Sequence, residues 1–140
     1  MESEKSTKIY LDANIYLDYL EERKDSVRPL DEFAFQLFKR VIKCEFRIAI
    51  SALVIEEVER NLSFLGQFQK LLESLSSVGK LEKVFILEED KVKARKFGNF
   101  ADALHAVAAR KAGCKFLVTR NIEHFLCFSG LIEPVLPENL

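Results

Sequence analysis

The chain has 140 residues, 49% of them hydrophobic and 31% charged, which is typical of a globular protein and excludes a disordered chain. Its formal net charge of −1 excludes a strongly basic coat for nucleic acid, although local basic patches can still bind phosphate. It shows no secretory signal and nothing near the roughly 18 apolar residues of a membrane span. We expect one domain over 1–140 with a polar lead over 1–7, no contact with a membrane, and a cytoplasmic location.

The first half of the chain alternates between short β-rich runs and helical periodicity. The apolar runs at 8–11 and 46–50 predict strands, and Ser51 is a good N-cap for the helix that follows the second of them. Apolar residues that recur every three or four positions predict four helices: 14–22, 30–44, 53–65 and 68–75.

The second half continues this alternation. The continuous apolar run VFIL at 84–87 is typical of a buried parallel strand, and KFLVT at 115–119 predicts another. Helices are predicted over 88–96 and 100–112. A fifth strand over 131–136 contains a proline, which confines it to an edge of the sheet. Strands separated by helices predict an α/β fold: a single three-layer domain with a mostly parallel sheet of four or five strands, flanked by helices.

Three cysteines, Cys44, Cys114 and Cys127, lie far apart and form no C-x-x-C pair. An odd number without metal-ligand spacing argues against a disulfide framework and against a zinc site. We therefore expect these residues to be reduced thiols in the core.

Polar residues come directly after three of the predicted strands: Asp12 and Asn14, Ser51, and Thr119 with Arg120 and Asn121. In open parallel sheets, ligands bind outside the carboxyl ends of the strands. An ionised carboxylate beside residues that favour burial, as Asp12 is, is costly unless a metal, hydrogen bonds or exposure compensate it. We expect a functional site at this edge of the sheet.

Two predicted helices carry further acids that could reach the same edge. In the helix after Ser51, Glu57 and Glu59 lie at the margins of the apolar stripe, and Glu57 is nearer the helix start. The helix over 100–112 is apolar most of the way around, so we expect it to be largely buried. It contains Asp102, which His105 could hydrogen-bond from three residues further on.

Each of these residues also has a structural interpretation. Asp12 could cap a helix, Glu57 could be solvated surface, and Asp102 could simply stabilise the start of its helix. Asn121 could be a turn residue. Three acids converge, however, when something positive lies between them, and hard divalent cations with oxygen ligands are the usual case.

The sequence resembles the PIN domain family, the fold of VapC-like toxin endoribonucleases. Four segments carry the likeness in the family's order: LDANIYLDYL, ISALVIEEVERNL, FADALHAVAARKAGCKFLVTRN and the HF of IEHF. The resemblance implies a parallel sheet flanked by helices and an acidic pocket that binds Mg2+ or Mn2+. The positions that match the family's motifs are Asp12, Glu57 and Asp102 for the acids, Asn14 for the polar partner, and Thr119 with Asn121 for the T-x-D or T-x-N segment.

We therefore predict a metal-dependent endoribonuclease that hydrolyses RNA phosphodiester bonds, in which a carboxylate-held ion activates water and binds phosphate. The predicted ligands are Asp12, Glu57 and Asp102, directly or through water. We expect Thr119 and Asn121 to orient water or phosphate. Asn14 and Arg120 are expected to contact the substrate.

Asn121 departs from the family pattern, because many members carry a fourth acid there. It leaves open whether the site holds one metal or two. It also favours the alternative of a catalytically weak or inactive PIN-fold module that binds RNA or serves as a scaffold. A phosphate-binding receiver-like protein ranks last, since the chain lacks a glycine-rich phosphate loop. The resemblance further implies an antitoxin partner that masks the pocket, and a homodimer.

Overall fold

Five parallel strands form one sheet in the order β3-β2-β1-β4-β5, within the residues that the computed structural model describes: 6–23, 28–63 and 65–140. The strands are β1 (Thr7–Leu11), β2 (Phe46–Ser51), β3 (Leu81–Val84), β4 (Phe116–Val118) and β5 (Glu133–Val135). The predicted parallel sheet is confirmed, and the strand that contains Pro134 lies at its edge. Most of the predicted polar lead lies outside the described residues.

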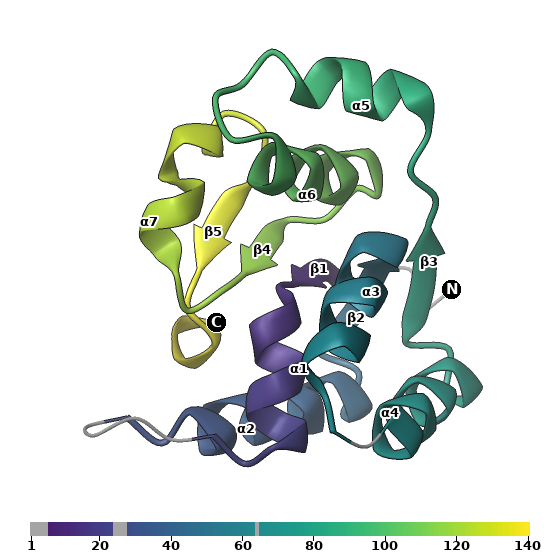
Figure 1. Cartoon of the computed structure of the whole chain (residues 1–140). Helices are drawn as coiled ribbons and strands as arrows, with labels where there is room; N and C mark the ends of the chain where they lie inside the picture. The colour runs from purple at the N-terminus through teal and green to yellow at the C-terminus, as the bar shows by residue number, and fades with distance from the viewer. Residues whose placement is uncertain (1–5, 24–27, 64) are drawn as a thin grey trace.

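Helices connect these strands and cover both faces of the sheet (Figure 1). From β1 to β3 the chain moves across the sheet in one direction, and from β3 it crosses back to β4 and continues in the other direction. Because such crossovers are right-handed, α1, α2 and α4 lie on one face of the sheet, and α5 and α6 lie on the other face. The α/β prediction is confirmed. In the described part of the chain, no helix is long and apolar enough to cross a membrane. The α-helices are α1 (Ala13–Leu20), α2 (Leu30–Ile42), α3 (Ala52–Asn61), α4 (Leu65–Ser77), α5 (Glu88–Ala94), α6 (Phe100–Lys111) and α7 (Ile122–Phe125).

The core centres on β1, which lies between β2 and β4. Its residues Ile9, Tyr10 and Leu11 have no exposed surface, as expected for a parallel strand covered on both faces. α6 buries every residue from Ala103 to Ala109, so the prediction of a largely buried helix is confirmed. Gly113 follows α6 with a φ of +79°, a left-handed conformation that glycine adopts without steric cost.

The predicted buried strand over 84–87 is wrong. β3 ends at Val84, which is the first residue of that predicted strand. Val84 pairs with Ser51, the last residue of β2, so the chain has no neighbouring strand beyond that point. Phe85 is consequently 74% exposed. A continuous apolar run therefore marked the end of an edge strand here rather than the middle of a central one.

The prediction of core thiols is also wrong. Cys44 and Cys127 are exposed, and Cys114 is partly buried. All three are free thiols, as expected from their spacing. Burial raises the pKa of the Cys114 thiol to about 12, so this group stays protonated at neutral pH.

Asp90, a buried carboxylate in the first turn of α5, joins that helix to α6. Its Oδ2 accepts hydrogen bonds from the Leu87 backbone N–H and from the Lys111 ammonium, both at 2.8 Å. Burial alone would raise the pKa of Asp90, but these two donors outweigh burial and hold the pKa below its ordinary value. The charged form of Asp90 is therefore the one that the fold stabilises.

Replacing Asp90 with asparagine should lower the free energy of unfolding at pH 7 by about 1–3 kcal/mol, because a buried donor loses its charged acceptor. A depressed carboxyl pKa contributes stability above the ordinary value of about 4, and this contribution is lost as the pH falls through the folded-state pKa. Urea unfolding at pH 7 and pH 3 should therefore show a deficit in Asp90→Asn that shrinks in acid. The exposed neighbour Glu89, changed to glutamine, is the matched control, and a pH-independent deficit would contradict this account.

Candidate active site

Asp12 lies where the carboxyl ends of β1 and β4 meet. Its backbone N–H donates to the Val118 carbonyl at 2.9 Å, which extends the pairing of the two strands by one residue. The Thr119 hydroxyl donates to Asp12 Oδ2 at 3.0 Å and accepts from the Asn121 backbone N–H at 3.0 Å. Asp12 holds the N-cap position of α1, yet its side chain makes no capping hydrogen bond, so capping does not explain this carboxylate.

The Asp12 carboxylate is poorly compensated. Burial raises its pKa, and the nearby charge of Glu57 raises it further, against hydrogen bonds from Thr119 and the Ala13 backbone. Among the described residues, no lysine or arginine makes an ion pair with it. A partly buried carboxylate that pairs with no lysine or arginine is the kind of group that a bound metal ion would stabilise.

Glu57, in the second turn of α3, lies close enough to Asp12 to influence its pKa. Its Oε1 lies 2.7 Å from Nε2 of the buried His105 on α6. This hydrogen bond outweighs partial burial and lowers the pKa of Glu57, so the side chain stays ionised. The Glu57 side chain bonds to a buried histidine and, being 36% exposed, also reaches solvent.

The prediction that His105 hydrogen-bonds Asp102 is wrong, because other groups occupy both ring nitrogens. Nε2 contacts Glu57, and Nδ1 lies 2.7 Å from the hydroxyl of Tyr10 on β1. Asp102 instead accepts from the Asn99 side-chain amide at 2.8 Å, and its own backbone N–H is capped by Asn99 at 3.3 Å. No described hydrogen bond or ion pair joins Asp102 to Asp12 or Glu57.

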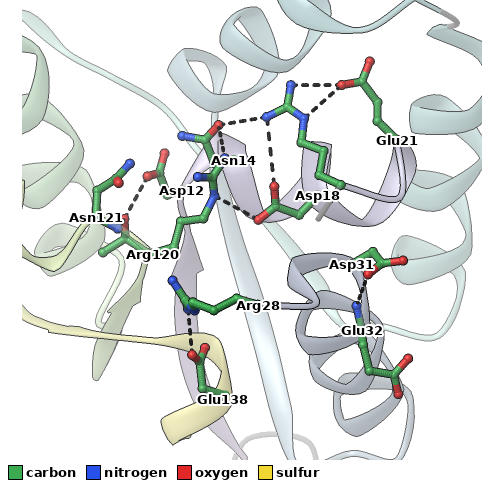
Figure 2. Close-up of polar contacts among 12 residues, drawn as sticks. Asp12, Asn14, Asp18, Glu21, Arg28, Asp31, Glu32, Arg120, Asn121 and Glu138 are labelled. Carbon is green, nitrogen blue, oxygen red and sulfur yellow. Dashed lines mark hydrogen bonds and ion pairs between the residues drawn. The ribbon is translucent and has the colours of Figure 1, made fainter. Parts of the chain in front are cut away.

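A second polar cluster lies beside Asp12 on α1 (Figure 2). Arg120 donates to Asp18 Oδ2 at 3.1 Å and to Asn14 Oδ1 at 3.5 Å, and Arg23 donates to the same Asn14 oxygen at 3.3 Å. Asp18 is only 2% exposed, and burial raises its pKa although both arginines act to lower it. The predicted substrate-binding residues Asn14 and Arg120 are thus bonded to each other, and Arg120 is also held by Asp18, an acid that sequence reasoning missed.

A sequence signal for Asp18 does exist. It interrupts the apolar run IYLDYL one helical turn after Asn14, the same pattern of a carboxylate among residues that favour burial that drew attention to Asp12. Tyr10 gave no such signal, because an aromatic residue in a buried strand is ordinary.

The oxygen donors partly fit a divalent cation. Mg2+ in proteins is usually bound through one or two carboxylates and keeps several waters, so Asp12 and Glu57 suffice in number. Within 6–23, 28–63 and 65–140, however, no three side chains of His, Cys, Asp or Glu are arranged to hold a metal ion. The structure places Glu57 within electrostatic range of Asp12, which Thr119 holds by a hydrogen bond, and leaves Asp102 with its helix cap.

Comparisons with known proteins agree with this fold. A chain in the structure of VapBC2 from Rickettsia felis, bound to a DNA fragment from its promoter, has a similar fold with a TM-score of 0.61. The two chains are 23% identical, and the match covers 92% of this chain and 99% of that chain. A toxin-antitoxin complex from Klebsiella pneumoniae gives 0.60, with 18% identity over 92% and 97% of the two chains. FitAcB from Neisseria gonorrhoeae gives 0.58, with 16% identity over 94% and 99%.

Sequence comparison assigns the family directly. No curated protein matches the chain significantly. The family model described as PIN domain matches residues 8–123, a segment that runs from β1 into α7 and includes every candidate site residue described above. The resemblance seen in the sequence is therefore confirmed, and the chain belongs to the PIN domain family.

Proposed function

We propose that the protein is a metal-dependent endoribonuclease and the toxin of a toxin-antitoxin pair. The observation that carries this proposal is the partly buried Asp12 carboxylate at the switch point of a parallel sheet, whose pKa is raised by burial and by the nearby charge of Glu57, with no lysine or arginine paired to it among the described residues. Membership of the PIN domain family supports a nuclease. The similar structure from Klebsiella pneumoniae is a toxin-antitoxin complex, which supports a protein partner.

Asp12 and Glu57 would hold a Mg2+ or Mn2+ ion, with Asp102 as a third ligand, directly or through water. A bound divalent ion supplies an activated water and neutralises charge that builds on the phosphate. Thr119 restrains Asp12 by donating to its Oδ2 at 3.0 Å. Asn121 follows Thr119 at the start of α7, and its side chain makes no capping bond, so its amide can orient water or phosphate.

Arg120 is the proposed contact for the RNA backbone. Its side chain is 26% exposed, and Asp18 holds its Nε, which leaves guanidinium N–H groups for a phosphate oxygen. The side-chain oxygen of Asn14 accepts hydrogen bonds from both Arg120 and Arg23. Asn14 would therefore contribute to substrate binding by positioning these two guanidinium groups. The antitoxin that we propose as partner would mask this pocket. The homodimer remains a prediction.

The second candidate is a PIN-fold module that binds RNA without cutting it. Two observations favour it: the amide at Asn121, and the hydrogen bonding of Asp102 to Asn99 rather than toward the other two acids. Both functions predict RNA binding, so they differ only in metal-dependent cleavage.

Cleavage of labelled single-stranded RNA by the purified chain should depend on Mn2+ or Mg2+ and stop in EDTA. The variants Asp12→Asn, Glu57→Gln and Asp102→Asn should each lower the cleavage rate about 100-fold or more, because each removes a charge that holds the ion. Glu59→Gln is the matched control, since Glu59 is an exposed acid two residues from Glu57 on the same helix. The second candidate, the PIN-fold module that binds RNA without cutting it, would be favoured if the folded protein, free of any partner, bound RNA and did not cleave it.

Thermal unfolding provides a test of the metal site that needs no substrate. Because burial raises the pKa of Asp12, the ionised side chain destabilises the fold at pH 7, and Asp12→Asn should raise the melting temperature in EDTA. Mn2+ should raise the melting temperature of the wild type by mass action and that of the variant much less. An equal effect of Mn2+ on both proteins would place the ion elsewhere.

A further inference from the structure

A chain of hydrogen bonds runs from the start of α3 back to Glu57 on the same helix. The Val54 backbone N–H donates to the Ser51 hydroxyl at 3.4 Å, and that hydroxyl lies 2.7 Å from the Tyr10 hydroxyl. Tyr10 lies 2.7 Å from His105 Nδ1, and His105 Nε2 lies 2.7 Å from Glu57 Oε1. The chain thus passes through β1 and α6, and three of its side chains are buried.

The two ends of this chain fix its direction. Glu57 Oε1 is a carboxylate oxygen and accepts, so His105 Nε2, 2.7 Å away, donates to it. In a neutral imidazole the other nitrogen then accepts, so the Tyr10 hydroxyl donates to His105 Nδ1. Tyr10 must in turn accept from Ser51, whose oxygen accepts from the Val54 backbone. Every donor therefore points toward Glu57.

A doubly protonated His105 would leave the hydrogen of a buried hydroxyl without an acceptor. If both ring nitrogens carried hydrogen, Tyr10 would accept from His105 and donate to Ser51. The fully buried Ser51 hydroxyl would then have no acceptor for its own hydrogen among the described residues. Buried polar groups are rarely left without a partner, so the neutral tautomer with hydrogen on Nε2 is the arrangement that satisfies this chain.

The side chain that the His105 hydrogen bond holds, Glu57, is a flexible one. Glutamate loses rotamer freedom when it is ordered, and a group that is ordered beforehand costs less to engage when a ligand binds. The His105 contact holds Oε1, and Oε2 has no hydrogen-bond partner in the described part of the chain. One oxygen is therefore anchored and the other is available.

From this geometry we propose that His105 is a positioning residue, which holds Glu57 in place for a divalent cation, and that Tyr10 and Ser51 select the His105 tautomer that does so. The inference rests on the proposed function, because Glu57 needs positioning only where it serves as a ligand. A purely structural role, in which the same bonds merely pack α3 against α6, is the competing explanation.

Two substitutions of similar size separate these explanations. His105→Gln places an amide N–H near the position of Nε2 and can still donate to Glu57, whereas the shorter His105→Asn cannot reach it. The Mn2+ dissociation constant, measured by calorimetry without RNA, should rise about 10- to 100-fold in His105→Asn and stay within about threefold in His105→Gln. Melting temperatures in EDTA show whether each variant folds, and His124→Asn, which changes an exposed histidine of α7, is the control.

Nitrogen NMR of the imidazole rings provides a second readout that packing alone would not fix. The chain contains two histidines, so His124→Asn leaves the His105 signals alone in the spectrum. They should show hydrogen on Nε2 and none on Nδ1, and Tyr10→Phe should shift the Nδ1 signal and mix the tautomers. Hydrogen on Nδ1 in the wild type would overturn the proposed direction.

The outcomes also separate this inference from the proposed function. Wild type that binds Mn2+ while both His105 variants bind it equally well, or equally poorly, overturns the positioning role and leaves the nuclease standing. Folded wild type that binds no Mn2+ overturns the metal-dependent nuclease, and with it the role of His105, because no ion remains for Glu57 to bind.

Discussion

The central place of β1 in the sheet determines where every polar group of the candidate site lies. Because β2 and β4 both run parallel to β1, all three strands end at the same edge. The residues that leave this edge are Asp12, Ser51 and Thr119, which are far apart in sequence. Hydrogen bonds link Thr119 to Asp12 and Ser51 to Tyr10, and Tyr10 connects through His105 on α6 to Glu57 on α3, so groups from several elements are tied to this one edge.

Three acids near this edge meet three different environments. Asp18 is deeply buried but forms ion pairs with two arginines, and Glu57 accepts a hydrogen bond from a histidine. Asp12 accepts a hydrogen bond from a threonine hydroxyl and, among the described residues, pairs with no lysine or arginine. The pKa of Glu57 is lowered while the pKa of Asp12 is raised, although the charge of Glu57 is near enough to act on Asp12. Proteins tolerate poorly compensated charge chiefly at functional sites, so Asp12 is the acid whose charge most needs a ligand.

Much of this arrangement could be predicted from local patterns. Strand ends, helix periodicity and the Ser51 cap depend on neighbouring residues, and they sufficed to place Asp12 and Glu57 at one edge. The partners of His105 could not be predicted, because Tyr10 is 95 positions away and only the folded sheet brings the two rings together. The cap on Asp102 was missed for a different reason: Asn99 competes locally for a carboxylate that was expected to face the other acids.

The two edges of the sheet also bear on how the protein associates with others. At one edge, β5 has three residues, and its central residue is Pro134, which lacks a backbone N–H. At the other, β3 carries the exposed charges of Glu82 and Lys83 and then ends. Short strands, charge and proline at an edge hinder the pairing of a further strand. Association by β-augmentation is therefore disfavoured on both sides, which leaves the helical faces as the surfaces for protein contacts.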